Sequence, residues 1–517
     1  MEKRANFGSK LGIVLASAGS AVGLGNVWRF PTEVGANGGG AFILIYVVCV
    51  LLLGLPLMVA EFIIGRRTHA NTADAFRILL REKGKEKSEK LREKGKEDLR
   101  EKLKEKSEKY KLPDGESQPH KGKSYFSLFS LPFSLNFSLF SFNFSLKSVW
   151  PVAGYLGVFT SWFILCYYGV VAGWTLKYLV ESGLGEVTRI TESTAYFTQF
   201  TSDPLIPLGY MAAVVLMCHL VIVRGVQKGI ERSSKLMMPL LLVIMVVLLF
   251  CSVSMPGAEA GIAFLLKPDF TKITSDVVLS AMGQAFFSLS IAMGCLCTYA
   301  SYFTADARLV KTAGSVALID TIVAVMSGFI IFPAVFSVTG VAPDAGPGLV
   351  FITLPKVFQS AFAAVPWLGG MFAFMFYLLL LLAALTSMMS IHEPPTAFLI
   401  ERFGITRHRA TMIVTSSCIF VGVLCSLSFG VLSDVRPLMG LTFFEFFDFV
   451  SAKIFLPVGG IMISLFTGWR LDREIIRGEL TNYGHHTVPD YLIRGFIFVL
   501  KWLAPLAIAL IFIYELR

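Results

Sequence analysis

The chain reads Gly-Ser-Ala-Val-Gly-Leu-Gly-Asn-Val-Trp-Arg-Phe-Pro over residues 19–31, inside an apolar stretch at about 11–36. Three glycines surround Asn26 there, and Arg29 follows. A helix that crosses lipid keeps its backbone hydrogen bonds within itself, and backbone freed at a break must face a cavity. The stretch therefore predicts a membrane helix broken at residues 21–26, with backbone groups directed into the protein.

Composition predicts an all-α polytopic membrane protein. Of the 517 residues 55% are hydrophobic, and the mean hydropathy is +0.67, more than a soluble surface tolerates. Apolar stretches of roughly 20 residues recur, each long enough to cross a hydrocarbon core of about 30 Å, whereas a β-barrel would show short alternating segments. The eight cysteines lie almost wholly in apolar runs, so we expect packing residues and no disulfide framework.

Eleven apolar segments predict about eleven transmembrane helices. They cover about 11–36, 41–65, 150–180, 207–224, 234–255, 276–302, 309–339, 368–400, 408–429, 443–468 and 491–514. With the N-terminus in the cytoplasm, basic residues gather in the cytoplasmic connections. The positive-inside rule therefore predicts a cytoplasmic N-terminus and an extracytoplasmic C-terminus. We expect the protein in the plasma (inner) membrane.

The segment 81–148 differs from the rest of the chain. Residues 81–123 carry 16 Lys/Arg against 11 Asp/Glu, and residues 125–146 are rich in Phe, Ser and Leu. A solvated charged segment and a segment that binds anionic lipid headgroups both fit this composition. We expect five parts: 1–80, the cytoplasmic insert 81–148, 149–255, 256–470, and 471–517, a cytoplasmic loop with the last helix.

A second interruption lies within 276–302, where Gly283, Ser288, Ser290 and Gly294 break a long apolar run. Two interrupted helices at corresponding places in two halves of a transporter expose carbonyls for a cation and positive helix ends for a carboxylate. The alternative is that the glycines only allow close helix packing. Polar residues at both breaks favour a binding site.

Four carboxylates lie in or near apolar segments, where a charge costs about 2.5–3.5 kcal/mol on insertion scales. They are Glu61, Asp320, Glu393 and Asp448. Asp320 has no basic neighbour in sequence and is the best candidate for a cation ligand. Enzyme motifs are incomplete: His392-Glu393-Pro-Pro lacks the second histidine of a zinc motif, and no phosphate-binding loop is present. We expect neither an enzyme nor an organic cofactor.

Several motifs together resemble the neurotransmitter:sodium symporter family, particularly its bacterial amino-acid transporters. They are residues 19–31, Asn-Gly-Gly-Gly-Ala-Phe at 37–42, Gln-Ala-Phe-Phe-Ser-Leu-Ser at 284–290 and Tyr-Ala-Ser-Tyr at 299–302. The resemblance covers the chain except the insert. It implies a 5+5 inverted-repeat fold in which helices 1 and 6 are broken and one further helix follows.

The resemblance also implies a substrate site and two sodium ions. The substrate carboxylate would meet the backbone of Leu24 and Gly25, the Tyr168 hydroxyl and the first sodium ion. The substrate pocket would be lined by Ile164, Phe287, Ser290, Met293, Ser387 and Ile391, with Ala21 and Ser288 also contacting substrate. The first sodium would use Ala21, Asn26, Ser288 and Asp320, and the second Gly19, Val22, Ala383, Thr386 and Ser387.

Gates follow from the same resemblance. The outer ion pair would join Arg29 and Asp448, above an aromatic lid of Tyr168 and Phe287. The inner latch would join Arg4 and Glu401, assisted by Phe7 and Tyr302. Glu61 would bond amides freed by the sixth-helix break, and Gly229 and Pro239 have the spacing that lets the fifth helix unwind in some members.

Two departures refine the expectation. Chloride-dependent relatives carry asparagine where Asp320 stands and serine where Ala324 stands, so the carboxylate predicts chloride independence. Met293 and Gly294 should leave room for a Leu, Phe, Tyr or Trp side chain. We expect a sodium-coupled importer of a neutral, hydrophobic or aromatic L-amino acid that works by alternating access; the alternative is a membrane sensor that binds an amino acid without moving it. Membrane lipid is an expected partner and nucleic acid is not, and the oligomeric state stays open.

Overall fold

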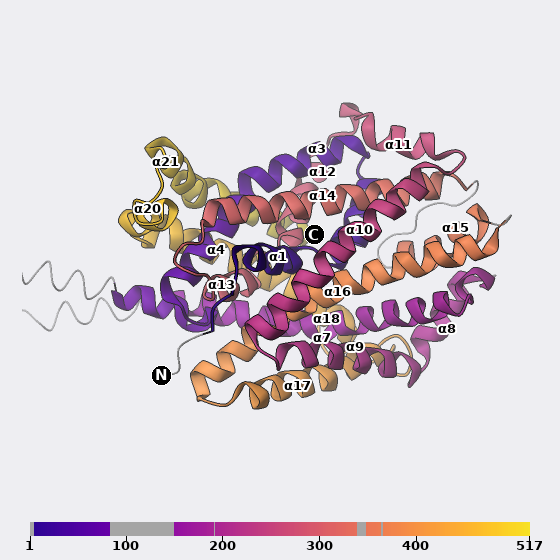
Figure 1. Cartoon of the computed structure of the whole chain (residues 1–517), viewed down its shortest axis with the longest axis horizontal. Coiled ribbons are helices and arrows are strands. Elements are labelled where there is room, and N and C mark those ends of the chain that lie inside the picture. The colour runs from indigo at the N-terminus through magenta and orange to yellow at the C-terminus, as the bar shows by residue number, and fades with distance from the viewer. Residues whose placement is uncertain (1–4, 83–148, 191, 339–347, 363–364, 517) are drawn as a thin grey trace, which may run out of the picture.

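The structure is a computed structural model, which describes residues 5–82, 149–190, 192–338, 348–362 and 365–516 (Figure 1). Regular structure within these ranges is helical, apart from an isolated bridge between Leu438 and Leu441. The predicted insert 81–148 lies outside the described residues except for its first two positions.

Short π-helical or 3-10 segments, labelled η, interrupt the α-helices. The first half contains α1 Lys10–Ala21, η1 Gly25–Arg29, α2 Phe30–Ala36, α3 Gly40–Cys49, η2 Val50–Gly54, α4 Leu55–Thr68, a helix at 72–82, α7 Trp150–Gly183, η4 Val187–Arg189, α8 Ser193–Ser202, α9 Ile206–Ile222, η5 Val226–Glu231 and α10 Arg232–Val253. The second half contains α11 Ala258–Leu266, η6 Phe270–Lys272, α12 Ser275–Ser288, α13 Cys295–Ala300, α14 Leu309–Phe336, η7 Leu349–Thr353, α15 Leu354–Ala361, α16 Pro366–Phe403, α17 Arg407–Leu427, α18 Phe443–Asp448, η8 Phe449–Phe455, α19 Leu456–Leu465, η9 Phe466–Arg470, α20 Arg473–Thr481, α21 Asp490–Phe498, η10 Val499–Leu503 and α22 Ala504–Glu515.

Each predicted span has a helical counterpart. By length and apolar composition, eight helical runs in the described residues could cross a membrane, and two bent helix pairs raise this number to ten. The pairs are Lys10–Ala21 with Gly25–Ala36, bent by 54°, and Ser193–Ser202 with Ile206–Ile222, bent by 76°. The interrupted pair α12 and α13 occupies the remaining predicted segment, 276–302.

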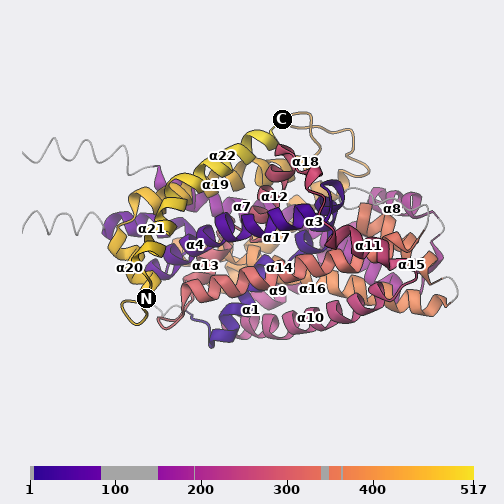
Figure 2. The same cartoon turned by 90° about the horizontal axis from the view of Figure 1, so that it is seen from above.

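The spans run along the long axis of the molecule (Figures 1 and 2). Helices α8, α11 and α15 lie at one end, which we name the α8 end, and α20 and α21 lie at the other, the α20 end. The most apolar windows of α7 and α16 are 72% and 67% buried, whereas those of η5–α10 and α21–α22 are 33% buried. Helices α7 and α16 therefore form the centre, and α10 and α22 expose apolar side chains at the periphery, as lipid-facing helices do.

Candidate functional site

The first span breaks where the sequence predicts it. Helix α1 begins at the cap of Ser9, whose hydroxyl accepts a bond from Gly12 N, and it ends before Val22, which is extended at ψ 110°. The amides beyond the break use side-chain acceptors, because Gly23 N donates to Asn26 Oδ1 at 3.0 Å and Leu24 N to the Tyr168 hydroxyl at 2.9 Å. These two freed amides are thus satisfied inside the protein, as lipid requires.

The second break, between α12 and α13, contains three left-handed residues. Ser290, Ala292 and Gly294 have φ of 52°, 65° and 75°, which is costly for the two that carry a Cβ. The Ala292 amide donates to Glu61 Oε1 at 2.6 Å, and the Ser290 hydroxyl donates to the carbonyl of Ser20 on α1 at 2.8 Å. These contacts hold the strained segment in place and join the two breaks directly.

A buried polar cluster connects both breaks to α14. Asn26 Nδ2 donates to Asp320 Oδ1 at 2.7 Å and to Ser288 Oγ at 3.1 Å, and Ser288 Oγ donates to Asp320 Oδ2 at 2.7 Å. Tyr46 on α3 adds a hydroxyl 3.3 Å from Asp320 Oδ2. All four residues are buried. The cluster brings together three of the four residues predicted for the first sodium, and the fourth, Ala21, lies at the end of α1 beside the break.

The predicted second sodium set lies where α1 crosses α16. A Cβ on Gly19 would stand 3.2 Å from Thr386 Cβ, and a Cβ on Gly23 would stand 3.1 Å from Ser387 Oγ, so glycines permit this approach. The Thr386 hydroxyl donates to its own helix, 3.0 Å from the carbonyl oxygens of Leu382 and Ala383. Its oxygen still has lone-pair capacity for a cation.

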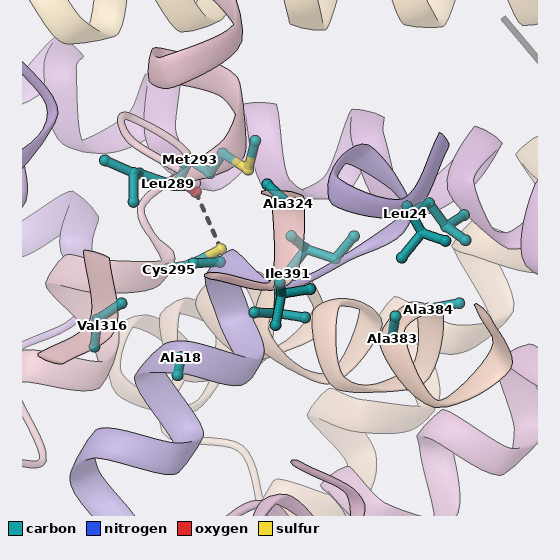
Figure 3. Close-up of a cluster of buried hydrophobic side chains, with 14 of the residues drawn as sticks. Ala18, Leu24, Leu289, Met293, Cys295, Val316, Ala324, Ala383, Ala384 and Ile391 are labelled. Atoms are coloured by element: carbon teal, nitrogen blue, oxygen red, sulfur yellow. Dashed lines mark hydrogen bonds between the residues drawn. The ribbon is translucent and has the colours of Figure 1, made fainter. Parts of the chain in front are cut away.

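Apolar side chains surround the two breaks (Figure 3). Leu24, Met293 and Ile391, together with Ala383 of α16, are buried there. Of the predicted pocket residues, Ile164 is also buried, and Phe287 packs on the first break, since a Cβ on Gly25 would come within 2.9 Å of its ring. The backbone of Met293 is anchored from α7, because its carbonyl accepts a hydrogen bond from Ser161.

The contacts of Arg29 in this conformation involve other carboxylates than the predicted Asp448. Its guanidinium pairs with Glu33 at 3.9 Å and with Glu515 of α22 at 3.8 Å, and it lies 4.5 Å above the Phe287 ring. Asp448 is hydrogen-bonded to Tyr167 and feels Arg29 only at longer range. In this conformation Glu33 and Glu515 are the carboxylates paired with Arg29, and the outer ion pair of Arg29 with Asp448 stays a prediction.

The inner latch cannot be followed completely, since Arg4 lies outside the described residues. Glu401 accepts hydrogen bonds from the backbone and side-chain nitrogens of Asn71, each at 2.8 Å. Phe7 does lie on Tyr302, with ring centroids 6.2 Å apart and a backbone bond of 3.0 Å from Phe7 N to Tyr302 O.

Other polar contacts were not predicted. The Tyr302 hydroxyl donates to Glu393, which pairs with Arg407 at 2.5 Å. Ser327 donates to the carbonyl of Asn26 at 2.5 Å. No signal in the sequence pointed to Tyr46, because a tyrosine in an apolar run is normally a packing residue. None pointed to Glu515, because its partner Arg29 lies near the other end of the chain.

Long apolar helices, two interrupted spans and a buried carboxylate at the breaks define a multi-pass membrane protein with a buried polar centre. Comparison with known proteins agrees. The model of the Sodium:neurotransmitter symporter family matches residues 4–81 and 205–516, which is more than half of the chain. The chain belongs to this family, and both the sequence-based resemblance and the predicted fold class are confirmed.

Similar proteins cover the full length. A Bacillus subtilis protein named an uncharacterized sodium-dependent transporter, YhdH, is 34% identical over 99% of this chain and 98% of its own length. An uncharacterized sodium-dependent transporter from Haemophilus influenzae is 31% identical over 100% of this chain and 99% of its own length. Among solved structures, the crystal structure of MhsT in complex with L-phenylalanine matches with a TM-score of 0.77. The two chains share 35% sequence identity, and the match covers 99% of each. The chain is accordingly a sodium-dependent, multi-pass membrane transporter.

Proposed function

We propose that the protein imports a neutral, hydrophobic or aromatic L-amino acid together with sodium, by alternating access. The observation that carries the proposal is the buried cluster of Asn26, Ser288 and Asp320 at two broken helices. Oxygen donors around a carboxylate suit a hard cation such as sodium. A relative with 35% identity was solved with L-phenylalanine, which supports the substrate class.

The proposed first sodium site uses the Ala21 carbonyl, Asn26, Ser288 and Asp320. Entry of the ion replaces the hydrogen bond from Asn26 Nδ2 to Asp320 Oδ1 by direct ionic contact. The second ion is proposed at Gly19, Val22, Ala383, Thr386 and Ser387. The substrate carboxylate is proposed to bind at Leu24 N and the Tyr168 hydroxyl, which now contact each other at 2.9 Å.

Membrane placement is part of the proposal. The α20 end, which carries the N-terminal Phe7 contacts, faces the cytoplasm of a plasma membrane, and the α8 end faces outside. The sodium gradient and the membrane potential drive accumulation, the latter at about 2.3 kcal/mol per charge per 100 mV.

The direct test is uptake of radiolabelled L-phenylalanine into proteoliposomes that contain the full chain. Uptake should require external sodium and stop when choline replaces it. Unchanged uptake in choline would refute sodium coupling, and binding without any uptake would favour an amino-acid sensor. A screen of the twenty amino acids as competitors then defines the side chain.

Asp320 also decides the role of chloride. A fixed carboxylate beside the ion supplies the negative charge that an anion would otherwise bring, so we expect uptake to be equal in chloride and gluconate. Asp320→Asn should make uptake sodium-defective or newly chloride-sensitive. Asp269→Asn, an exposed carboxylate with only local partners, is the matched control. If the sodium dependence and the chloride sensitivity of uptake are both unchanged in Asp320→Asn, Asp320 is not a ligand of the first sodium ion.

A further inference from the structure

Arg29 is surrounded by carboxylates from three different places in the chain. Glu33 lies one turn further along the same helical run, Glu515 comes from α22, and Asp448 closes α18. The distances to Glu33 and Glu515, 3.9 and 3.8 Å, indicate charge attraction without a direct hydrogen bond. The Arg29 side chain is 29% exposed, so water solvates it as well. A guanidinium held in this way exchanges partners at little cost.

The end of helix α22 packs close to Arg29 through Glu515. Glu515 lies over Gly283 of α12, where an added Cβ would come within 3.3 Å of Glu515 Oε1. Phe287, one turn further along α12, is the ring on which Arg29 rests. The backbone carbonyl of Glu515 accepts a hydrogen bond from Lys453 Nζ at 3.2 Å, and Lys453 belongs to η8, directly after the segment that carries Asp448. The end of α22 therefore contacts both α12 and the segment that follows Asp448.

We propose that Glu515 is a second, competing anion of the outer gate. It holds Arg29 in the conformation seen here and releases it to Asp448 when the outer side closes over bound substrate, so α22 takes part in gating. The inference rests on the proposed function. Glu33 cannot play this part, because it lies four residues from Arg29 in the same helical run and moves with it. A partner that stays in contact in both states shifts no equilibrium.

The test uses equilibrium binding of radiolabelled L-phenylalanine to the purified full-length protein in saturating sodium. Glu515→Gln removes the contact with Arg29 that this conformation shows, so the affinity should rise about two- to five-fold, the range of one partly exposed ion pair. Asp448→Asn removes the contact of the closed state and should lower the affinity. Combining both substitutions should return the affinity to near the wild-type value. Glu33→Gln, with a similar distance and exposure, is the matched control and should change affinity less than twofold.

Uptake kinetics give a readout that a structural defect would not produce. Glu515→Gln should lower both KM and the maximal rate per molecule, because Arg29 leaves Asp448 more slowly. Glu515→Asp, which keeps the charge, should lie between this variant and the wild type. Equal or weaker binding in Glu515→Gln, the same gain in Glu33→Gln, or a double variant weaker than both single ones would overturn the proposal. A wild-type protein without sodium-dependent uptake would refute the proposed function instead.

Discussion

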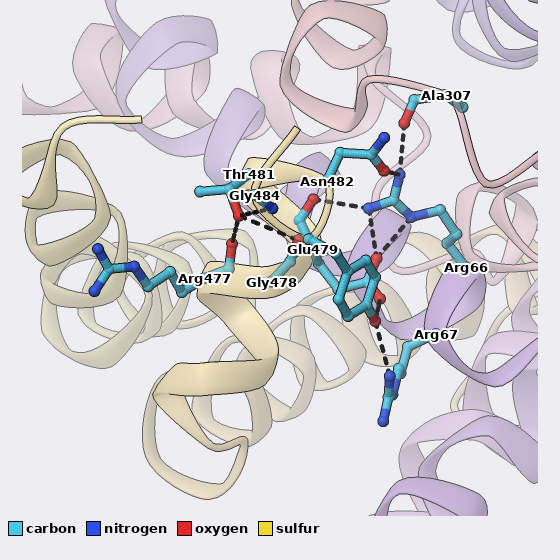
Figure 4. A network of polar contacts seen from close by, with 10 residues as sticks. Arg66, Arg67, Ala307, Arg477, Gly478, Glu479, Thr481, Asn482 and Gly484 are labelled. Atoms are coloured by element: carbon cyan, nitrogen blue, oxygen red, sulfur yellow. Dashed lines mark hydrogen bonds and ion pairs between the residues drawn. The ribbon is translucent and has the colours of Figure 1, made fainter. Parts of the chain in front are cut away.

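Arg66 and Arg29 both lie at helix ends near carboxylates, but they differ in burial and in the distance to those carboxylates. Arg66 is 4% exposed and Glu479 is 2% exposed. The Arg66 guanidinium donates to Glu479 Oε2 at 2.6 Å, to the Glu479 carbonyl at 2.7 Å and to the Ala307 carbonyl at 2.5 Å (Figure 4). Arg29 is 29% exposed, and its carboxylates stand 3.8 and 3.9 Å away. Tight bonding fixes α20 to the end of α4, whereas loose pairing leaves a charge able to change partner.

The largest expected effect comes from breaking the tight site. Arg66→Ala leaves the Glu479 carboxylate buried without its cation, which costs about 3–5 kcal/mol. We expect a strong loss of thermal stability in detergent and little folded protein. Replacing both members by apolar residues, Arg66→Met with Glu479→Leu, should recover most of the stability, because no buried charge then remains. If the double variant is no more stable than Arg66→Ala, charge burial is not the cause.

Removing Arg29 should have a small effect on stability and a large effect on uptake. Arg29→Ala should lower the free energy of unfolding by less than about 1 kcal/mol, as for other partly exposed ion pairs. Sodium-driven uptake should nevertheless fall by about tenfold, equivalent to 1.4 kcal/mol, because the proposed outer gate loses its cation. Thermal melts and uptake rates on the same preparation check both halves. A variant whose melting and uptake fall in proportion would place Arg29 among the structural residues.

The smallest effect is expected for Arg67, the sequence neighbour of Arg66. It adjoins Arg66 but is 32% exposed, and it contacts Glu82 at 3.3 Å and the Tyr483 hydroxyl at 2.8 Å. Arg67→Ala should cost less than about 1 kcal/mol and leave uptake unchanged. A loss of stability as large as that of Arg66→Ala would show that burial is not what separates the two neighbours.

Local pattern was sufficient to predict the spans and both breaks, because glycines and polar residues in apolar runs act within a few residues. Asp320 could be singled out for the same reason, since its charge conflicts with its surroundings. The choice of partner for Arg29 could not be predicted: besides the nearby Glu33, the carboxylates of Glu515 and Asp448 come from distant parts of the chain, and only packing sets their distances. Tyr46 and the Arg66 contacts depend on packing in the same way.

The hydrogen-bond partners described for Asp320 all precede it in the chain. Asn26, Tyr46 and Ser288 lie on segments that a ribosome delivers before α14. Insertion of a carboxylate near the middle of a 28-residue helix costs about 2.5–3.5 kcal/mol, which the apolar remainder of α14 can offset. We therefore expect α14 to enter the bilayer after the segments that carry the hydrogen-bond partners of Asp320, so that the carboxylate meets partners that are already synthesised.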